Sequence, residues 1–264
     1  MHAALVQFKP RKGDVAANLA TMREVFTQLA PDEPDLIVFP EAALTGYFLE
    51  GAVYELAVDA PTMAQRVDEQ WRASGATRPC DVVIGFYENV AGTFHNSAIY
   101  VRCGEDDGVH IVHVHRKMFL PTYGVFDEER FLTRGRRLSV FDTPFGPAAI
   151  LICEDAWHAI MPTVAALKGA RLMIVPSASP GRGLSADGEL ESTARWKSLL
   201  SSAAAEHGVY VLYAGLTGFE GGKGMSGGTC AFSPRGDLLQ TAGLLDACIV
   251  KVELDPTEVD LARA

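Results

Sequence analysis

The chain has 264 residues, of which 48% are hydrophobic, and 33 acidic against 23 basic residues give a formal net charge of −10. This length is sufficient to bury one large core, so we expect a single domain over residues 1–264. The negative charge would repel a phosphate backbone, which argues against nucleic acid as a partner.

The N-terminal sequence lacks a charged leader followed by a long apolar segment, and no later apolar run approaches the roughly 18 residues of a membrane span. We therefore expect a cytoplasmic protein with no membrane contact. The five cysteines show no CxxC spacing, and an odd number cannot all pair. This pattern favours reduced thiols.

Short β-rich runs alternate with amphipathic stretches in the first half of the chain. Residues 3–8 predict a strand, residues 14–30 have apolar positions at helical spacing, and residues 35–40 (DLIVFP) predict a second strand. Residues 81–101 predict a strand, a glycine-containing turn and a return strand. Residues 109–117 (VHIVHVHRK) predict one more strand, which ends in a lysine.

The second half repeats this order. Residues 148–155, 159–170 and 171–180 predict strand, helix and strand. Residues 209–232 have the same pattern as residues 81–101, which is a strand, a glycine-rich turn and a return strand. Residues 194–207 add a helix. We predict an α/β fold, a four-layer α-β-β-α sandwich with an internal pseudo-two-fold repeat, in which two similar units pack sheet against sheet. Such packing would bring together the segments that follow residues 36–40, 150–153 and 172–176.

Three predicted strand ends carry reactive side chains: Glu41, Lys117 and Cys153. Taken singly, each has an ordinary interpretation, as a solvated loop glutamate, a surface lysine and a buried core thiol. Together they form a set for amide hydrolysis. A free thiol is only about 3% ionised at neutral pH, so a cysteine nucleophile needs a neighbouring base or cation. A glutamate can move that proton, and a lysine can stabilise the oxyanion of the intermediate.

The sequence resembles the nitrilase, or carbon–nitrogen hydrolase, superfamily over nearly its whole length. Three motifs carry the resemblance, in order: FPEAALTGY with Glu41, HRKMFLPTYGVFDEERF with Lys117, and LICEDAW with Cys153. The resemblance implies that Cys153 is the nucleophile, Glu41 the general base and acid, and Lys117 the oxyanion donor, helped by the backbone N–H after the cysteine. It also implies that Glu128 is a second glutamate that holds Lys117 and helps to position the substrate. No cofactor is implied.

Within the superfamily, the motifs look most like the glutaminase domain of glutamine-dependent NAD synthetases. We predict an amidase that cleaves a non-peptide amide of a small molecule through a cysteine thioester and releases ammonia or an amine. The alternatives are an ammonia donor to a separate synthetase subunit, a nitrilase and a non-catalytic binding module. The sequence does not select one substrate from glutamine, ω-amides, aliphatic amides, carbamoyl compounds and nitriles.

Seven residues are candidates for the substrate pocket. They are Tyr47, Tyr123, Phe126, Glu154, Ser177, Ser179 and Arg182. The three aromatic residues could line an acyl pocket or simply pack in loops. The two serines and the arginine are placed there by pseudo-symmetry with the Glu41 segment, and Arg182 could bind a substrate carboxylate through two hydrogen bonds.

A metal site is a competing interpretation, because residues 109–117 contain His110, His113 and His115, the last two on one face of a strand. Two histidines are too few for a zinc site, and no HExxH or CxxC motif completes one. We therefore predict no metal. The resemblance further implies a homodimer or a larger homo-oligomer.

Overall fold

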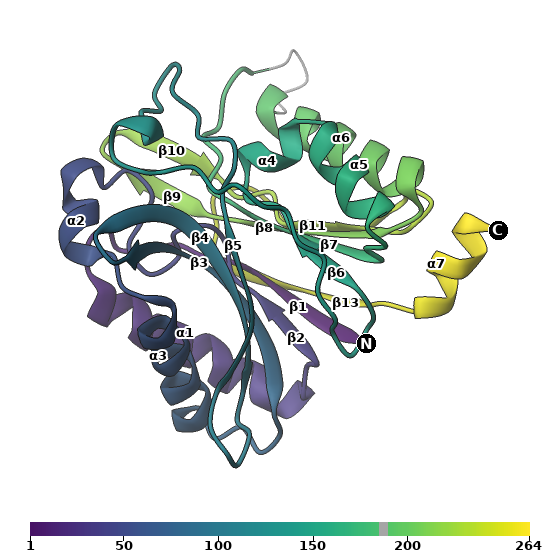
Figure 1. The fold of residues 1–264 in the computed structure, drawn as a ribbon, viewed down its shortest axis with the longest axis horizontal. Helices are drawn as coiled ribbons and strands as arrows, with labels where there is room; N and C mark the ends of the chain where they lie inside the picture. The colour runs from purple at the N-terminus through teal and green to yellow at the C-terminus, as the bar shows by residue number, and fades with distance from the viewer. Residues whose placement is uncertain (185–189) are drawn as a thin grey trace.

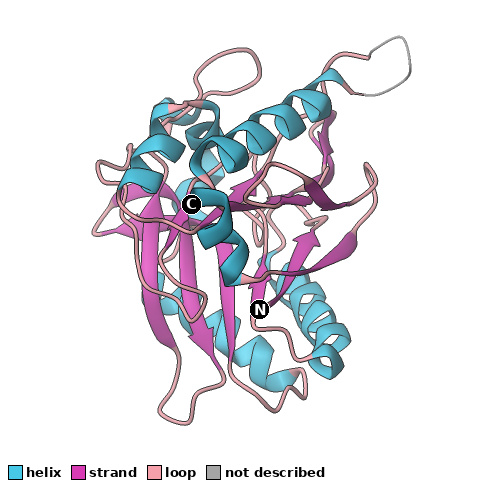
Figure 2. Ribbon diagram, turned by 90° about the vertical axis from the view of Figure 1, so that its right-hand side faces the viewer, coloured by secondary structure: helices cyan, strands magenta, loops and turns pink. Residues whose placement is uncertain are grey.

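The computed structural model describes residues 1–184 and 190–264. Two β-sheets pack face to face, and helices cover the outer face of each sheet (Figure 1). Figure 2, turned by 90°, shows the same helices on both outer sides of the strands. This arrangement is the predicted four-layer sandwich.

The first sheet has the strand order β13-β1-β2-β3-β4-β5. Its strands are β1 (His2–Gln7), β2 (Leu36–Val38), β3 (Cys80–Val90), β4 (Thr93–Cys103), β5 (His110–Arg116) and β13 (Cys248–Glu253). Strands β1, β2 and β3 are parallel, whereas β3, β4 and β5 are antiparallel neighbours. Strand β13 extends the sheet by pairing antiparallel with β1.

The second sheet has the order β12-β11-β8-β7-β6. Its strands are β6 (Ala148–Ile150), β7 (Leu172–Ser177), β8 (Tyr210–Gly215), β11 (Cys230–Phe232) and β12 (Leu238–Thr241). Again the first three strands are parallel and the last two pair antiparallel. The order and direction of β6, β7, β8, β11 and β12 therefore repeat those of β1 to β5, which confirms the predicted pseudo-two-fold repeat.

The described residues form seven α-helices. They are α1 (Val15–Leu29), α2 (Val53–Leu56), α3 (Ala60–Ala73), α4 (Glu154–Trp157), α5 (Ile160–Leu167), α6 (Glu191–His207) and α7 (Pro256–Arg263), with short 3₁₀ turns at Ala30–Asp32, Glu50–Ala52 and Glu128–Arg130. Helices α1 and α3 lie against the first sheet, and α5 and α6 cover the second (Figure 1). Helix α3 was absent from the sequence prediction, although Asp59 marks its start by accepting a hydrogen bond from the Thr62 N–H.

The main core lies between the sheets. Leu5, Val38 and Val83 of the first sheet pack there with Ile174 and Leu212 of the second, and all five are 0% exposed. Alternate residues of the first sheet face the opposite way, toward α1 and α3. Because both faces of these strands are buried, the sequence runs LIVF and LMIV are continuously apolar.

One predicted element differs from the structure. Residues 209–232 do not form a single hairpin. The chain between β8 and β11 forms two more strands, β9 (Thr217–Glu220) and β10 (Lys223–Ser226), which pair with each other as a separate two-stranded sheet. The chain leaves β8 at Gly215, where a Cβ atom would come within 2.3 Å of the Gly227 carbonyl oxygen. This close approach lets the extra hairpin project before the chain returns to the sheet.

The helices of residues 1–184 and 190–264 are too short or too polar to cross a lipid bilayer.

Candidate active site

The strand ends singled out in the sequence meet between the two sheets. Glu41 lies three residues after β2, Lys117 directly after β5, and Cys153 three residues after β6. The Lys117 ammonium donates to Glu41 Oε1 at 2.7 Å and to Glu128 Oε1 at 2.9 Å. The Lys117 and Glu41 side chains are 0% exposed. The structure thus joins these three charged residues in one buried network.

Hydrogen bonds from three neutral groups fix the two carboxylates. Asn96 Nδ2 donates to Glu41 Oε1 at 2.7 Å and to Glu128 Oε1 at 3.0 Å. The Tyr47 hydroxyl donates to Glu128 Oε1 at 2.6 Å, and the backbone N–H of Ala178 donates to Glu41 Oε2 at 2.7 Å. The Ala178 bond connects the segment after β7 to the segment after β2, which is the convergence predicted from the repeat.

Two carboxylates share one ammonium ion in this network, and burial acts on all three groups. Burial alone would lower the pKa of Lys117, but the Glu128 and Glu41 carboxylates outweigh it and hold that pKa well above its ordinary value. Burial raises the pKa of Glu128, and the negative charge of Glu41 adds to this effect while Lys117 opposes it. Lys117 therefore remains a cation inside the protein.

Cys153 occupies a strained turn between β6 and α4. Its φ of 44° and ψ of −102° are rare for any residue other than glycine and typically cost about 1–3 kcal/mol. The Cys153 N–H donates to the Pro176 carbonyl at 3.0 Å, which ties the turn to β7. Such strain at a nucleophile candidate is a common feature of functional sites, where the surrounding structure holds one side chain in a fixed direction.

The thiol of Cys153 is protonated in the free protein. Burial raises its pKa well above the ordinary value, and the Glu41 carboxylate raises it further. Lys117 and hydrogen bonds from Ser177 and Ala178 lower the pKa only in part. A reaction at this sulfur therefore needs a base that accepts the thiol proton during attack, and Glu41 is the adjacent carboxylate.

A cavity of about 180 Å³ opens beside Cys153. Its other lining residues are Tyr123, Phe126, Glu154, Trp157, Ser179, Pro180, Arg182 and Ser192. Five of the predicted substrate-binding residues, Tyr123, Phe126, Glu154, Ser179 and Arg182, thus line the cavity of the cysteine. The Arg182 guanidinium lies 5.1 Å from the centre of the Phe126 ring, and the Tyr123 hydroxyl donates to the Glu154 carboxylate. The cavity combines aromatic walls with one positive and one negative side chain.

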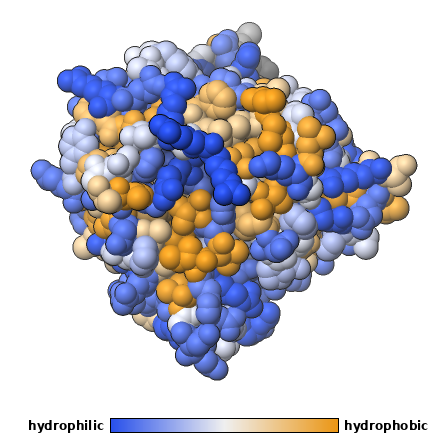
Figure 3. Space-filling model, viewed as in Figure 1, coloured by the Kyte–Doolittle hydropathy of each residue, from blue (hydrophilic) through white to orange (hydrophobic). Residues whose placement is uncertain are grey.

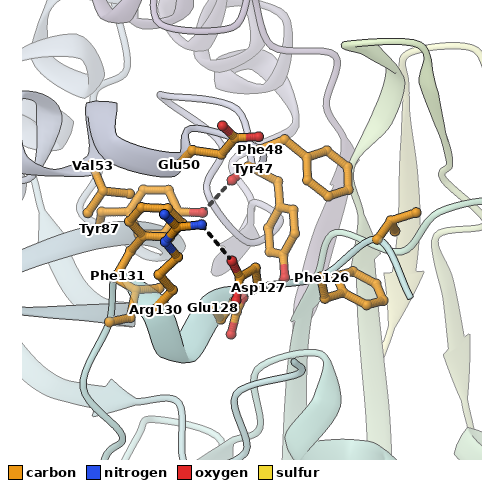
Figure 4. A pocket seen from close by; sticks show the side chains of 12 residues that line it. Tyr47, Phe48, Glu50, Val53, Tyr87, Phe126, Asp127, Glu128, Arg130 and Phe131 are labelled. Carbon is orange, nitrogen blue, oxygen red and sulfur yellow. Dashed lines mark hydrogen bonds and ion pairs between the residues drawn. The ribbon is translucent and has the colours of Figure 1, made fainter. Parts of the chain in front are cut away.

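Two predicted pocket residues have other surroundings. Ser177 is fully buried beside Cys153, where its side chain lowers the pKa of the thiol. Tyr47 lines a second cavity of about 200 Å³, shown in Figure 4, together with Phe126 and Glu128. In the wall of this second cavity, the Tyr87 hydroxyl donates to the Tyr47 carbonyl at 2.6 Å. Glu128 and the Tyr47 ring separate this second cavity from Lys117.

Three residues of the site were missed in the sequence. Asn96 lies within β4, where the polar run His95, Asn96 and Ser97 inside a mostly apolar strand is the signal that could have identified it. Asp155 belongs to the CEDAW motif and binds four donors, as described below. Glu220, in the glycine-rich hairpin, accepts hydrogen bonds from the backbone N–H groups of Tyr47 and Phe48 at 2.8 and 2.9 Å. Nothing in its sequence context distinguishes Glu220 from a solvated turn residue.

The three histidines of β5 have separate partners. His115 Nε2 contacts Asp155 at 2.9 Å, and His110 Nε2 contacts Asp107 at 2.7 Å. The His113 ring stacks on Phe141, and burial lowers its pKa to about 4. Within residues 1–184 and 190–264, no group of three or more His, Cys, Asp or Glu side chains is arranged to hold a metal ion.

Residues 2–264 match the family model of the carbon-nitrogen hydrolases, and the chain therefore belongs to that family. The glutamine-dependent NAD(+) synthetase of Thermotoga maritima is 29% identical over 262 residues, which cover 98% of this chain and 42% of that protein. The chain thus spans less than half the length of this relative.

Two solved structures share the fold over the full length of the chain. A member of branch 10 of the nitrilase superfamily from Saccharomyces cerevisiae superposes with a TM-score of 0.82 at 23% identity, covering 100% of this chain and 93% of that one. A variant of the amidase from Nesterenkonia sp. AN1 superposes with a TM-score of 0.81 at 22% identity, covering 100% and 95%. In that amidase structure the acetamide moiety of fluoroacetamide is covalently added at the active-site cysteine.

Proposed function

We propose that this carbon-nitrogen hydrolase is an amidase that cleaves a non-peptide amide of a small molecule through a thioester on Cys153. The observation that carries the proposal is the buried network of Glu41, Lys117 and Glu128 beside a cysteine that lines a cavity. The adduct on the active-site cysteine of the Nesterenkonia amidase supports the same chemistry on the same fold.

Each residue of the network has a role in the proposed reaction. Glu41 accepts the Cys153 proton as the sulfur attacks the amide carbon. Lys117 and the backbone N–H of Glu154 stabilise the oxyanion. Glu41 then gives its proton to the departing nitrogen, the C–N bond breaks, and ammonia or an amine leaves a thioester. Glu41 then deprotonates a water molecule that attacks the thioester carbon. The C–S bond breaks, the carboxylic acid leaves, and the proton on Glu41 returns to the Cys153 sulfur. Glu128 holds Lys117 throughout.

The cavity limits the size of the substrate. Its volume of about 180 Å³ lies below the roughly 300–1,000 Å³ typical of sites for drug-sized ligands, which favours a small amide. A nitrile would enter the same site, because thiolate attack on a nitrile gives a thioimidate.

A second candidate function is a glutaminase that donates ammonia to a separate synthetase subunit. Arg182 and Glu154 both line the cavity, and together they would match the carboxylate and ammonium groups of a zwitterionic amide such as glutamine. The name of the Thermotoga relative supports this alternative. The matched region covers 42% of that protein.

A substrate panel tests the proposal. The protein is incubated with glutamine, other ω-amides, aliphatic amides, carbamoyl compounds and nitriles; ammonia is measured, and acyl adducts on Cys153 are sought by mass spectrometry. Ammonia release from glutamine but not from aliphatic amides would select the glutaminase. The absence of both turnover and an adduct across the whole panel would contradict the amidase and favour a non-catalytic binding module.

We further propose that residues 1–264 act as one domain and associate as a homodimer or larger homo-oligomer. The shared core between the two sheets supports the single domain. Helix α5 presents Ile160 and Leu167 to solvent at 58% and 83% exposure, and Figure 3 shows apolar side chains gathered over this part of the surface. Light scattering of the wild type and of an Ile160→Asp, Leu167→Asp variant tests the association.

A further inference from the structure

Asp155 binds four hydrogen-bond donors from two different segments of the chain. Its Oδ1 accepts from the backbone N–H groups of Met118 and Phe119, both at 2.9 Å. Its Oδ2 accepts from the Ile152 N–H at 3.2 Å and contacts His115 Nε2 at 2.9 Å. The side chain is 0% exposed. Every lone pair that a carboxylate can offer in its plane is therefore used.

The donors lie on either side of Lys117. His115 precedes it by two residues on β5, and Met118 and Phe119 follow it directly. Asp155 itself is two residues after Cys153, and its fourth donor, Ile152, precedes the cysteine. One buried carboxylate thus connects the segment that carries the ammonium to the turn that carries the thiol.

The other backbone bonds of Lys117 do not make this connection. Its N–H donates to the Asn96 carbonyl of β4, and its carbonyl accepts from the Gly135 N–H. Both bonds anchor Lys117 to its own sheet and to the following loop. The Cys153 turn is anchored separately to β7 through Pro176. Among the described residues, the contacts of Asp155 are therefore the direct hydrogen-bonded link between the two backbone segments.

We propose that Asp155 and His115 are positioning residues that set the distance between the Lys117 ammonium and the Cys153 sulfur. This inference rests on the proposed function, in which Lys117 stabilises an oxyanion formed at the carbon attacked by Cys153. An oxyanion donor must lie within about 0.5 Å of its productive position. Loosening either segment therefore reduces the stabilisation of the transition state more than it reduces the affinity for the substrate. Asp155 does not line the cavity beside Cys153.

His115 gives the cleaner test, because replacing Asp155 would leave several buried N–H groups without acceptors. A carboxylate is an acceptor, so His115 Nε2 carries the hydrogen in this contact, while its Nδ1 has no partner among the described residues. Glutamine extends far enough to offer an N–H at the position of Nε2, whereas asparagine is one methylene shorter. His115→Gln should therefore keep the link and His115→Asn should break it. His113→Asn is the matched control on the same strand.

The first readout is the steady-state rate of the best amide in the panel. His115→Asn should lower kcat at least about tenfold with KM changed less than about threefold, as expected when a stabilising contact of the transition state is lost. His115→Gln and His113→Asn should stay within about threefold of the wild type in both constants.

The second readout needs no turnover: iodoacetamide alkylation of Cys153 from pH 7 to 10, followed by peptide mass spectrometry. Lys117 favours the Cys153 thiolate, so displacing it should slow alkylation at pH 8 at least about threefold in His115→Asn. The exposed Cys248 is the internal reference and should react equally in all variants. The other ionisable groups around the thiol, none of which is substituted in these variants, are Glu41, Lys117, Tyr47, Tyr123 and Tyr213.

The outcomes separate the two proposals. If His115→Asn is thermally destabilised but keeps the wild-type kcat and Cys153 alkylation rate, the residue is merely structural and the inference is wrong. Equal losses in His115→Gln and His115→Asn, or in His113→Asn, would also overturn it. If the wild type turns over no amide but the alkylation rates of the variants separate as expected, the positioning link stands and the proposed function fails.

Discussion

Replacing Lys117 by methionine should have a pH-dependent effect on stability and a large effect on catalysis. The change removes the ammonium that Glu41 and Glu128 share and leaves their two buried carboxylates together. Removing one partner of a buried ion pair costs about 3–5 kcal/mol. At roughly 2–4 °C per kcal/mol for a protein of this size, the melting temperature at pH 8 should fall by about 6–20 °C.

The sign of the pH dependence follows from Glu128. Burial already raises its pKa, and Lys117 is the group that opposes this rise, so the pKa should climb further in the variant. A carboxyl group whose pKa is raised by folding contributes stability that is fully present below its unfolded pKa, about 4.3, and is lost as pH rises through the folded value. The deficit of Lys117→Met relative to the wild type should therefore be smaller at pH 5 than at pH 8.

Thermal unfolding by circular dichroism at pH 5 and 8, with ammonia release in parallel, measures both effects. In Lys117→Met, kcat should fall by about 10²–10³ through the lost oxyanion donor. The double variant Lys117→Met, Glu128→Gln should regain stability at pH 8 but not kcat. Lys251→Met, which removes an exposed ion pair with Asp32, is the control and should cost less than about 1 kcal/mol. An equal deficit at both pH values, or a kcat within tenfold of the wild type, would refute the reasoning.

Four further changes test the rest of the site. Cys153→Ala should abolish ammonia release and adduct formation while far-UV circular dichroism stays unchanged; residual turnover would contradict the nucleophile assignment. Glu41→Gln should lower kcat by about 10²–10⁴ because proton transfer is lost, whereas a change in KM alone would mean that its role is misassigned. Asn96→Asp places a third carboxylate against Glu41 and Glu128 and should lower the free energy of unfolding by at least about 1–3 kcal/mol in urea titrations at pH 8. An unchanged midpoint would speak against the two hydrogen bonds of Asn96. Arg182→Met should raise KM at least about tenfold for carboxylate-bearing amides but not for aliphatic amides; equal changes for both would exclude a carboxylate contact.

The sequence was informative where one residue type is forced by its surroundings. The runs at residues 36–39 and 172–175 could be predicted as strands because burial on both faces excludes polar residues there. The positions of Glu41, Lys117 and Cys153 could be predicted because each follows a predicted strand, and functional side chains gather where strands end. The two halves of the repeat then brought these ends to one place.

The remaining partners depend on geometry that no single segment encodes. Asn96 reaches both carboxylates because the β4–β5 register places its carbonyl against the Lys117 N–H. That register shifts at an irregularity between Tyr100 and Val101. Glu220 reaches the Tyr47 loop only because the β9–β10 hairpin leaves the second sheet. Sequence pattern fixed neither the register nor the direction of the hairpin, so both residues were missed.

The repeat is symmetric in its strands but not in its chemistry. The segment after β2 supplies a carboxylate, Glu41, while the equivalent segment after β7 supplies a backbone N–H, from Ala178, which binds that carboxylate. The segment after β6 supplies the Cys153 thiol. The end of the equivalent strand β1 carries Gln7, whose amide binds backbone groups of residues 229, 243 and 246. The second half therefore holds the carboxylate of the first half in place. A duplicated scaffold of this kind can build an asymmetric site without distorting either sheet, because strand ends differ freely in sequence while the strands between the sheets must stay apolar.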